Sequence, residues 1–226
     1  MNMEKTRVAV VLSGCGVYDG AEIHESVFTL LALDRAGVDY QCLAPDIKQL
    51  HVVNHMTGDE MPETRNVLIE AARIARGVVN PLSDFRVADF DALIIPGGFG
   101  AAKNLCDFAV AGTDCTVNPD MRRAVTAMVD AGKPIGALCI APTVIAKILN
   151  GATVTIGRDE ATANAIESMG GHHVKTLHGG VVRDDRYRLV TAPCYMLEST
   201  ISQIADGAEN AVRALLDMVA EAKAAA

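Results

Sequence analysis

Short apolar runs recur along the chain, and each is bounded by glycine, proline or polar residues. They begin at Val8 (VAVVLSG), Val38 (VDYQCLAP), Asp91 (DALIIPGG), Lys133 (KPIGALC) and Ala152 (ATVTIG). Brief apolar runs with such boundaries are typical of parallel strands that are buried on both faces. We therefore expect each of these runs to form a strand of one sheet.

Segments with a helical spacing of apolar residues separate these runs. One is expected over residues 21–36, where the closing Arg-Ala-Gly is a helix-end signal, and another over 63–76. A third should start at Pro119, with Asn118 as its N-cap, and end at Gly132. Alternating strands and helices predict an α/β fold, in which a parallel sheet carries helices on both faces.

The pattern changes near the C-terminus. The segment VVRDDRYRLVTAP predicts a hairpin that turns at Asp184 and Asp185, and a long Ala-rich helix is expected from about Glu198 to Ala226. We expect the tail beyond Ala222 to fray. No linker or repeat interrupts the pattern, so residues 1–226 are expected to form one domain.

Composition and charge narrow the choice of partners. Half of the 226 residues are apolar, but only 4% are aromatic and none is Trp, which predicts an aliphatic core. The formal net charge is −8, and no basic run of five residues occurs. We therefore expect neither nucleic acid nor an anionic membrane surface as a partner. No apolar run approaches the roughly 18 residues that a membrane span needs.

The cysteines and the N-terminus bear on the compartment. The six cysteines form neither a CxxC motif nor a metal-like cluster, so we expect free thiols in a reducing compartment and no bound metal. The first residues, MNMEKTRVAVVLSG, run directly into the first strand and do not have the pattern of a targeting peptide. On this basis the expected location is cytoplasmic.

The segment PIGALCIAPTVIAKIL places a thiol where chemistry is common in α/β proteins. A buried strand runs into a helix with only Cys139 and Ile140 at the junction. This turn would present Cys139 at the carboxyl edge of the sheet, where helix N–H groups favour a thiolate and lower the thiol pKa. The alternative is a small apolar cysteine that fills the strand end. No other cysteine is expected in an equivalent turn.

Two more loops are expected at the same edge. In IIPGGFGAAKNL, two glycines follow a buried strand, and the Gly98 N–H could lie beside the Ile140 N–H as an oxyanion hole if the two strands are neighbours. A plain helix start is the alternative. In VVLSGCGVYDGAEIHES, Glu25 lies one turn into a helix near its apolar face. It is either a helix-capping carboxylate or a buried one that shuttles protons near neutral pH.

Taken together, these motifs resemble a known superfamily. A helix Glu after the first strand, a PGG loop and an elbow Cys, in that order, look like the DJ-1/PfpI superfamily, related to class I glutamine amidotransferases. The longer motifs SGCGVYDGAEIHES, PGGFGAAKNL, CTVNP, KPIGALCIAP and TIGRDE resemble the ES1/ElbB family. The resemblance extends over roughly residues 7–216.

The resemblance implies a flavodoxin-like three-layer sandwich, mostly parallel, that forms homodimers. It implies that Cys139 is the reactive thiol, that Glu25 is the buried acid/base about 3 Å from its sulfur, and that the Gly98 and Ile140 amides form the oxyanion hole. It also implies a weak, glutathione-independent glyoxalase activity on small 2-oxoaldehydes such as methylglyoxal, with no cofactor.

The sequence departs from the superfamily in its histidines. No His-x-Glu occurs, Ile140 replaces the His that follows the elbow Cys in PfpI-like members, and Ile156 and Gly157 lie where DJ-1-like members carry a His. The base is therefore not identified by motif, and His24 is the best histidine candidate. Further pocket candidates are Cys15, Gly97, Phe99 and Asn54, with Cys15 either a resolving thiol or a small loop residue.

Two functions of different classes remain open. In the first, Cys139 adds to the aldehyde of a 2-oxoaldehyde and Glu25 moves a proton between the two adjacent carbons, so that a hydroxyacid is released. In the second, Cys139 is an oxidisable thiol of a redox sensor or stress-response protein, because an accessible thiolate also oxidises readily. The missing histidine favours the second function or a slow enzyme.

Overall fold

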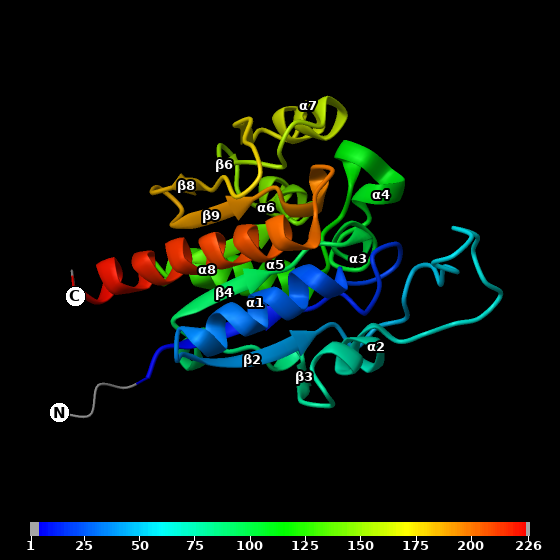
Figure 1. Cartoon of the computed structure of the whole chain (residues 1–226), viewed down its shortest axis with the longest axis horizontal. Coiled ribbons are helices and arrows are strands. Elements are labelled where there is room, and N and C mark those ends of the chain that lie inside the picture. Colours follow the sequence, from blue (N-terminus) through cyan, green and yellow to red (C-terminus); the bar gives the residue numbers. More distant parts are fainter. Residues whose placement is uncertain (1–4, 225–226) are drawn as a thin grey trace.

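A seven-stranded sheet forms the centre of the computed structural model, which describes residues 5–224 (Figure 1). The strand order is β3-β2-β1-β4-β5-β9-β8, and only β8 runs antiparallel to its neighbour. The strands are β1 (Arg7–Val11), β2 (Asp39–Ala44), β3 (Val79–Pro81), β4 (Ala92–Ile95), β5 (Ile135–Leu138), β8 (Val182–Asp184) and β9 (Leu189–Ala192). The mostly parallel α/β fold expected from the sequence is therefore confirmed.

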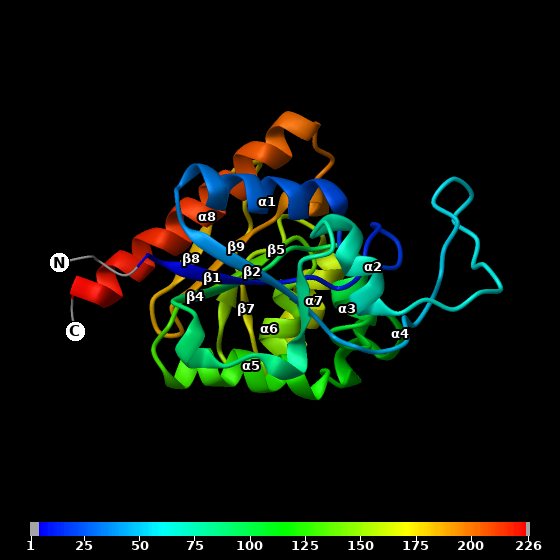
Figure 2. The ribbon, with the colours of Figure 1, turned by 90° about the horizontal axis from the view of Figure 1, so that it is seen from below.

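Helices cover both faces of the sheet, so that Figure 2 shows three layers. The α-helices are α1 (Ile23–Arg35), α2 (Val67–Ile74), α3 (Phe99–Lys103), α4 (Phe108–Ala111), α5 (Pro119–Asp130), α6 (Pro142–Ile148), α7 (Glu160–Ser168) and α8 (Ile201–Ala224). Helices α1 and α8 pack on one face and α5 on the other (Figure 2). Because β1 is buried on both sides, its residues alternate between two cores: Val8 and Val10 face α1, whereas Ala9 and Val11 face α5.

The run from Ala152 departs from the expectation. It forms only the short strand β6 (Thr153–Val154), which pairs with β7 (His172–His173) in a separate two-stranded sheet. Side-chain hydrogen bonds replace the ladder after Val154, since the Thr155 N–H donates to Thr191 Oγ1 at 2.9 Å and Thr155 Oγ1 accepts the Gly157 N–H at 3.0 Å. The predicted fifth strand of the central sheet is therefore wrong.

Two helices begin later than expected because polar side chains cap them. Helix α2 starts at Val67 and not at Glu63, since the Asn66 side chain accepts the Ile69 N–H at 3.0 Å. Helix α8 starts at Ile201 and not near Glu198. The Asn118 cap of α5 and the β8–β9 hairpin are confirmed. The sequence did not reveal that β9 joins the central sheet beside β5.

The segment between β2 and α2 stands away from the rest of the molecule in both views (Figures 1 and 2). It is an extended loop held by two isolated bridges, Lys48 to Asn66 and Val53 to Glu60. Met56 near its tip is 96% exposed. We refer to residues 45–66 as the arm.

Candidate functional site

The site lies at the carboxyl edge of the sheet, where β4, β5 and β9 end side by side. Gly97 follows β4, Cys139 follows β5 and Cys194 follows β9. The first turn of α1 closes this edge, because the Glu22 N–H donates to Gly97 O at 2.9 Å. The carboxyl edge is where open α/β sheets bind ligands.

The turn at Cys139 has the strained geometry of a nucleophile elbow. Cys139 has a φ of +58°, in the left-handed region that residues with a side chain rarely adopt, and its N–H donates to Ala192 O of β9 at 2.9 Å. Helix α6 follows at once, with Pro142 at its first position. The turn predicted from the sequence is confirmed. The thiol is only 7% exposed and is not the accessible group that we expected.

The glycines of the PGG loop leave space that the site occupies. A Cβ on Gly97 would overlap the Cys139 side chain and lie 2.6 Å from Glu25 Oε2. Gly98 has a φ of +94°, and a Cβ there would collide with the backbone of Gly20 and Glu22. Gly97 is therefore required on steric grounds, and Gly98 on both steric and conformational grounds.

Glu25 is completely buried, and both of its oxygens accept backbone hydrogen bonds. The Gly97 N–H donates to Oε2 at 2.9 Å and the Tyr195 N–H to Oε1 at 3.1 Å. The pKa of Glu25 is raised to about 7, mainly by burial and further by the Glu22 charge, and the hydrogen bonds from Tyr195, Gly97 and Cys139 oppose this rise. A carboxyl with this pKa exists in both protonation states near neutral pH.

The Cys139 thiol lies against this carboxyl and against two amides. The N–H groups of Gly98 and Ile140 donate to the sulfur and lower its pKa. Burial and the Glu25 charge outweigh them and raise the pKa of the thiol well above its usual range. The expected low pKa of Cys139 is therefore wrong, because the turn is closed to solvent.

The two acids are best described as a pair. A second negative charge in this buried space is opposed by the first, so the pair carries at most one charge near neutral pH. The amides of Gly97 and Tyr195 stabilise that charge on the carboxyl, and those of Gly98 and Ile140 stabilise it on sulfur. Each of the two positions of that charge therefore faces two backbone N–H groups.

The best histidine candidate lies at the rim of the site. His24 is exposed, and its Nδ1 is 2.8 Å from the Tyr195 hydroxyl and 4.0 Å from Glu22 Oε1. His24 therefore contacts Tyr195, the residue whose backbone N–H donates to Glu25. No local sequence pattern indicates this role of Tyr195, because its contact with Glu25 spans 170 residues.

Three other pocket candidates fall elsewhere. Burial raises the pKa of Cys15. Of the two nearby charges on α2, Glu70 raises this pKa further and Arg73 lowers it. The Asn54 side chain accepts the Met56 N–H at 2.9 Å and closes a turn of the arm. Phe99 begins α3 at the surface, where its N–H donates to Val17 O at 2.8 Å. None of the contacts described for these three residues reaches Cys139 or Glu25.

The sequence analysis missed a second thiol at this edge. Cys194 lies two residues beyond β9, also with a left-handed φ, of +42°, and is 5% exposed. Burial raises its pKa, as do the charges on Glu25 and Cys139. The expectation that no other cysteine occupies an equivalent turn is therefore wrong.

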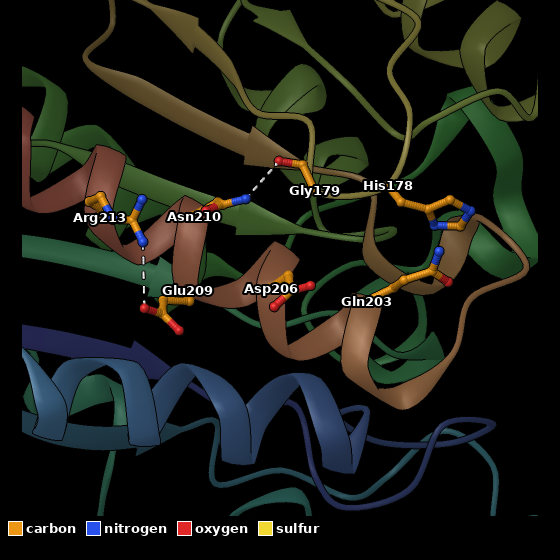
Figure 3. A pocket seen from close by; sticks show the side chains of 7 residues that line it. All are labelled: His178, Gly179, Gln203, Asp206, Glu209, Asn210 and Arg213. Atoms are coloured by element: carbon orange, nitrogen blue, oxygen red, sulfur yellow. Dashed lines mark hydrogen bonds and ion pairs between the residues drawn. The ribbon is translucent and has the colours of Figure 1, made fainter.

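A separate hollow lies along α8 (Figure 3). Its volume is about 430 Å³, and it is lined by His178, Gly179, Gln203, Asp206, Glu209, Asn210 and Arg213. Its side chains are partly tied to their surroundings, since Asn210 donates to Gly179 O at 3.1 Å and Arg213 pairs with Glu209 at 3.5 Å. It contains no nucleophile, so we place the chemistry at Cys139.

Within residues 5–224, no group of three or more His, Cys, Asp or Glu side chains is arranged to hold a metal ion. None of the helices in that range has the length and apolarity needed to cross a membrane. All six cysteines are free thiols.

Comparisons with known proteins agree with this geometry. The DJ-1/PfpI family profile matches residues 9–195. A human protein, glutamine amidotransferase-like class 1 domain-containing protein 3, mitochondrial, is 47% identical over 94% of this chain and 83% of its own length. The rat ES1 protein homolog, mitochondrial, is 44% identical over 95% of this chain and 84% of its own length.

Solved structures give the same result. An isoprenoid biosynthesis protein with an amidotransferase-like domain from Ehrlichia chaffeensis is 37% identical, with a TM-score of 0.88 over 94% of this chain and 99% of that one. Drosophila melanogaster DJ-1beta, at 19% identity and a TM-score of 0.54 over 98% of each chain, shares the fold.

The relatives correct one expectation. The human, rat and zebrafish proteins are all mitochondrial by name, which contradicts the cytoplasmic location expected from the N-terminal pattern. The packing of a domain carries no information on its compartment, so the fold could not have revealed this error. The family match and the three relatives together show that the chain belongs to the DJ-1/PfpI family, among the ES1 proteins.

Proposed function

We propose that the chain is a slow, glutathione-independent glyoxalase-type enzyme that acts on small 2-oxoaldehydes. The observation that carries this proposal is the contact between Cys139 and a fully buried Glu25 whose pKa is about 7. The reaction needs a nucleophile next to a group that both removes and returns a proton near neutral pH. The Cys139–Glu25 pair supplies both.

The first step is addition of the thiol to the aldehyde. The sulfur attacks the aldehyde carbon while its proton passes to Glu25, and the oxygen takes up negative charge. The N–H groups of Gly98 and Ile140, which donate to the sulfur in the free enzyme, are close enough to stabilise that oxygen. Glu25 then passes this proton to the oxygen, which gives a hemithioacetal and leaves Glu25 as a carboxylate.

The second stage moves one proton between adjacent carbons. The Glu25 carboxylate removes the proton from the former aldehyde carbon, which gives an enediolate, and Glu25 returns this proton to the neighbouring carbon. The hydroxyl proton of the former aldehyde carbon passes to the oxygen of the neighbouring carbon. The product is a thioester of a 2-hydroxyacid on Cys139. Water hydrolyses this thioester, which releases the hydroxyacid and the free thiol.

Two features support a small substrate and a slow turnover. Cys139 is only 7% exposed, which favours compact aldehydes such as methylglyoxal and glyoxal. The hydrolytic step has no histidine inside the site, because the nearest candidate, His24, lies at the rim with its Nδ1 against the Tyr195 hydroxyl. We expect thioester hydrolysis to limit the rate.

The test follows methylglyoxal consumption in three variants. Cys139→Ser should abolish it, and Glu25→Gln should reduce it at least 100-fold, the scale of a lost general acid/base. Glu25→Gln should nevertheless keep Cys139 reactive towards iodoacetamide, since the amide still reaches the sulfur. Cys115→Ser, which removes a buried thiol outside this site, is the control and should retain activity. Normal turnover by Glu25→Gln would exclude Glu25 as the proton carrier.

A second candidate function is redox sensing through Cys139. The absence of a histidine base inside the site favours it, because such a base would otherwise complete the hydrolytic step. Mild peroxide should then oxidise the Cys139 thiol while methylglyoxal is left unchanged. Methylglyoxal turnover without peroxide sensitivity would exclude this candidate.

A further inference from the structure

Cys139 and Cys194 occupy matching positions on neighbouring strands. Leu138 of β5 is paired in register with Ala192 of β9, so the two cysteines lie one and two residues beyond a paired position. The hydrogen bond from the Cys139 N–H to Ala192 O continues the pairing past the strand end. Neighbouring strands lie about 4.8 Å apart, and a disulfide bridges Cα atoms separated by about 4.4–6.8 Å.

Both thiols lie on the same side of the sheet. Cys139 contacts Glu25 of α1, and Cys194 Sγ lies 3.6 Å from where a Cβ on Gly207 of α8 would stand. Helices α1 and α8 cover one face of the sheet (Figure 2). Cys194 therefore also faces the side of the sheet that α1 and α8 cover.

The electrostatics link the two thiols. The Glu25 charge acts on both of them, and charge on Cys139 acts on Cys194. The other buried pair is separate, since Cys106 and Cys115 hydrogen-bond to one another. The charges that shift the pKa of Cys15 include Glu70 and Arg73 on α2, and neither Cys139 nor Cys194 is among them. Among the six cysteines, Cys194 is thus the one coupled to the elbow thiol.

We propose that Cys194 is the resolving thiol of Cys139, so that oxidation by a peroxide ends in a Cys139–Cys194 disulfide. The peroxide first transfers one oxygen to the Cys139 sulfur, which gives a sulfenic acid and releases water or an alcohol. The Cys194 sulfur then attacks the Cys139 sulfur, and the sulfenic hydroxyl leaves with the Cys194 proton as water. The peroxide is the only oxidant required.

This inference goes beyond the aldehyde chemistry and rests only on oxidation of Cys139. The disulfide would hold the elbow thiol in a reducible form and keep it from the irreversible sulfinic acid. Low exposure of both thiols restricts the oxidant to small peroxides.

Trypsin separates the relevant thiols into different peptides. Because Lys133 precedes a proline, Cys139 is released in residues 124–147, whereas Cys194 is in 189–213 and Cys106 and Cys115 share 104–122. The full chain is treated with hydrogen peroxide, blocked, digested and analysed by mass spectrometry. We expect peptides 124–147 and 189–213 to be joined, and a thiol reductant to separate them.

Two variants sharpen the result. In Cys194→Ser, and equally in Cys194→Ala, peptide 124–147 should gain two oxygens, because the sulfenic acid has no partner. Cys115→Ser should still form the joined peptides. The inference is overturned if the wild-type chain accumulates oxygen on Cys139 while peptide 189–213 remains linear. If Cys139 takes up no oxygen and forms no bond, the redox candidate fails with it, whereas methylglyoxal turnover tests the glyoxalase proposal separately.

Discussion

Glu25 combines complete burial with a charge that it does not lose entirely at neutral pH. Its oxygens accept N–H groups from Gly97 and Tyr195, and these bonds favour the carboxylate. Burial favours the neutral acid more strongly than these bonds favour the carboxylate, so the pKa rises to about 7. A group with a raised acid pKa binds more protons in the folded than in the unfolded state at intermediate pH.

This difference predicts how stability depends on pH. A raised carboxyl pKa stabilises the fold fully below the unfolded value near 4.5, and the contribution disappears as the pH rises through about 7. Between pH 5.5 and pH 8 the wild-type chain should lose roughly 2 kcal/mol of unfolding free energy from this group. Urea titrations of wild type and Glu25→Gln at both pH values measure it. Equal losses in the two proteins would mean that Glu25 titrates normally.

One buried amide, that of Asn104, connects three loops around the site. Asn104 follows α3, and its Nδ2 donates to Ser13 O and Asp19 O, each at 2.9 Å. Its Oδ1 accepts the Leu50 N–H at the base of the arm, at 3.0 Å. One side chain thus joins the loop after β1, the arm and the end of α3.

Asn104→Ala should therefore be costly. It leaves two buried carbonyls and one N–H without partners, and we expect a loss of roughly 3 kcal/mol in unfolding free energy. Asn118→Ala makes the same chemical change at the N-cap of α5 and should cost about 1 kcal/mol. Chemical denaturation compares the two variants. If Asn104→Ala costs no more than Asn118→Ala, the loops do not depend on this amide.

The sequence predicts most of the elements and the core of the site because their signals are local. A strand that ends directly in Cys139, and glycines directly after the β4 strand, are visible in a few consecutive residues. The roles of Cys194 and Tyr195 are not, since both depend on β9 lying beside β5. The hairpin pattern predicts that β9 pairs with β8, but nothing in it indicates the strand on the other side.

At the scale of the molecule, the resemblance to the superfamily predicts a homodimer. Sedimentation equilibrium at micromolar concentration should give twice the 23.8 kDa of the chain. Dilution should shift the distribution towards monomer by mass action if the interface is weak. A mass of one chain at every concentration would contradict the prediction.

The contact between Tyr195 and Glu25 has a consequence for biosynthesis. Glu25 is translated 170 residues before Tyr195, and Cys139 also leaves the ribosome ahead of β9. At ordinary elongation rates the nascent chain carries the elbow thiol without its neighbouring strand for on the order of several seconds. During that interval the sulfur lacks the closed turn that later restricts access, so aldehydes and oxidants meet it most easily on the growing chain.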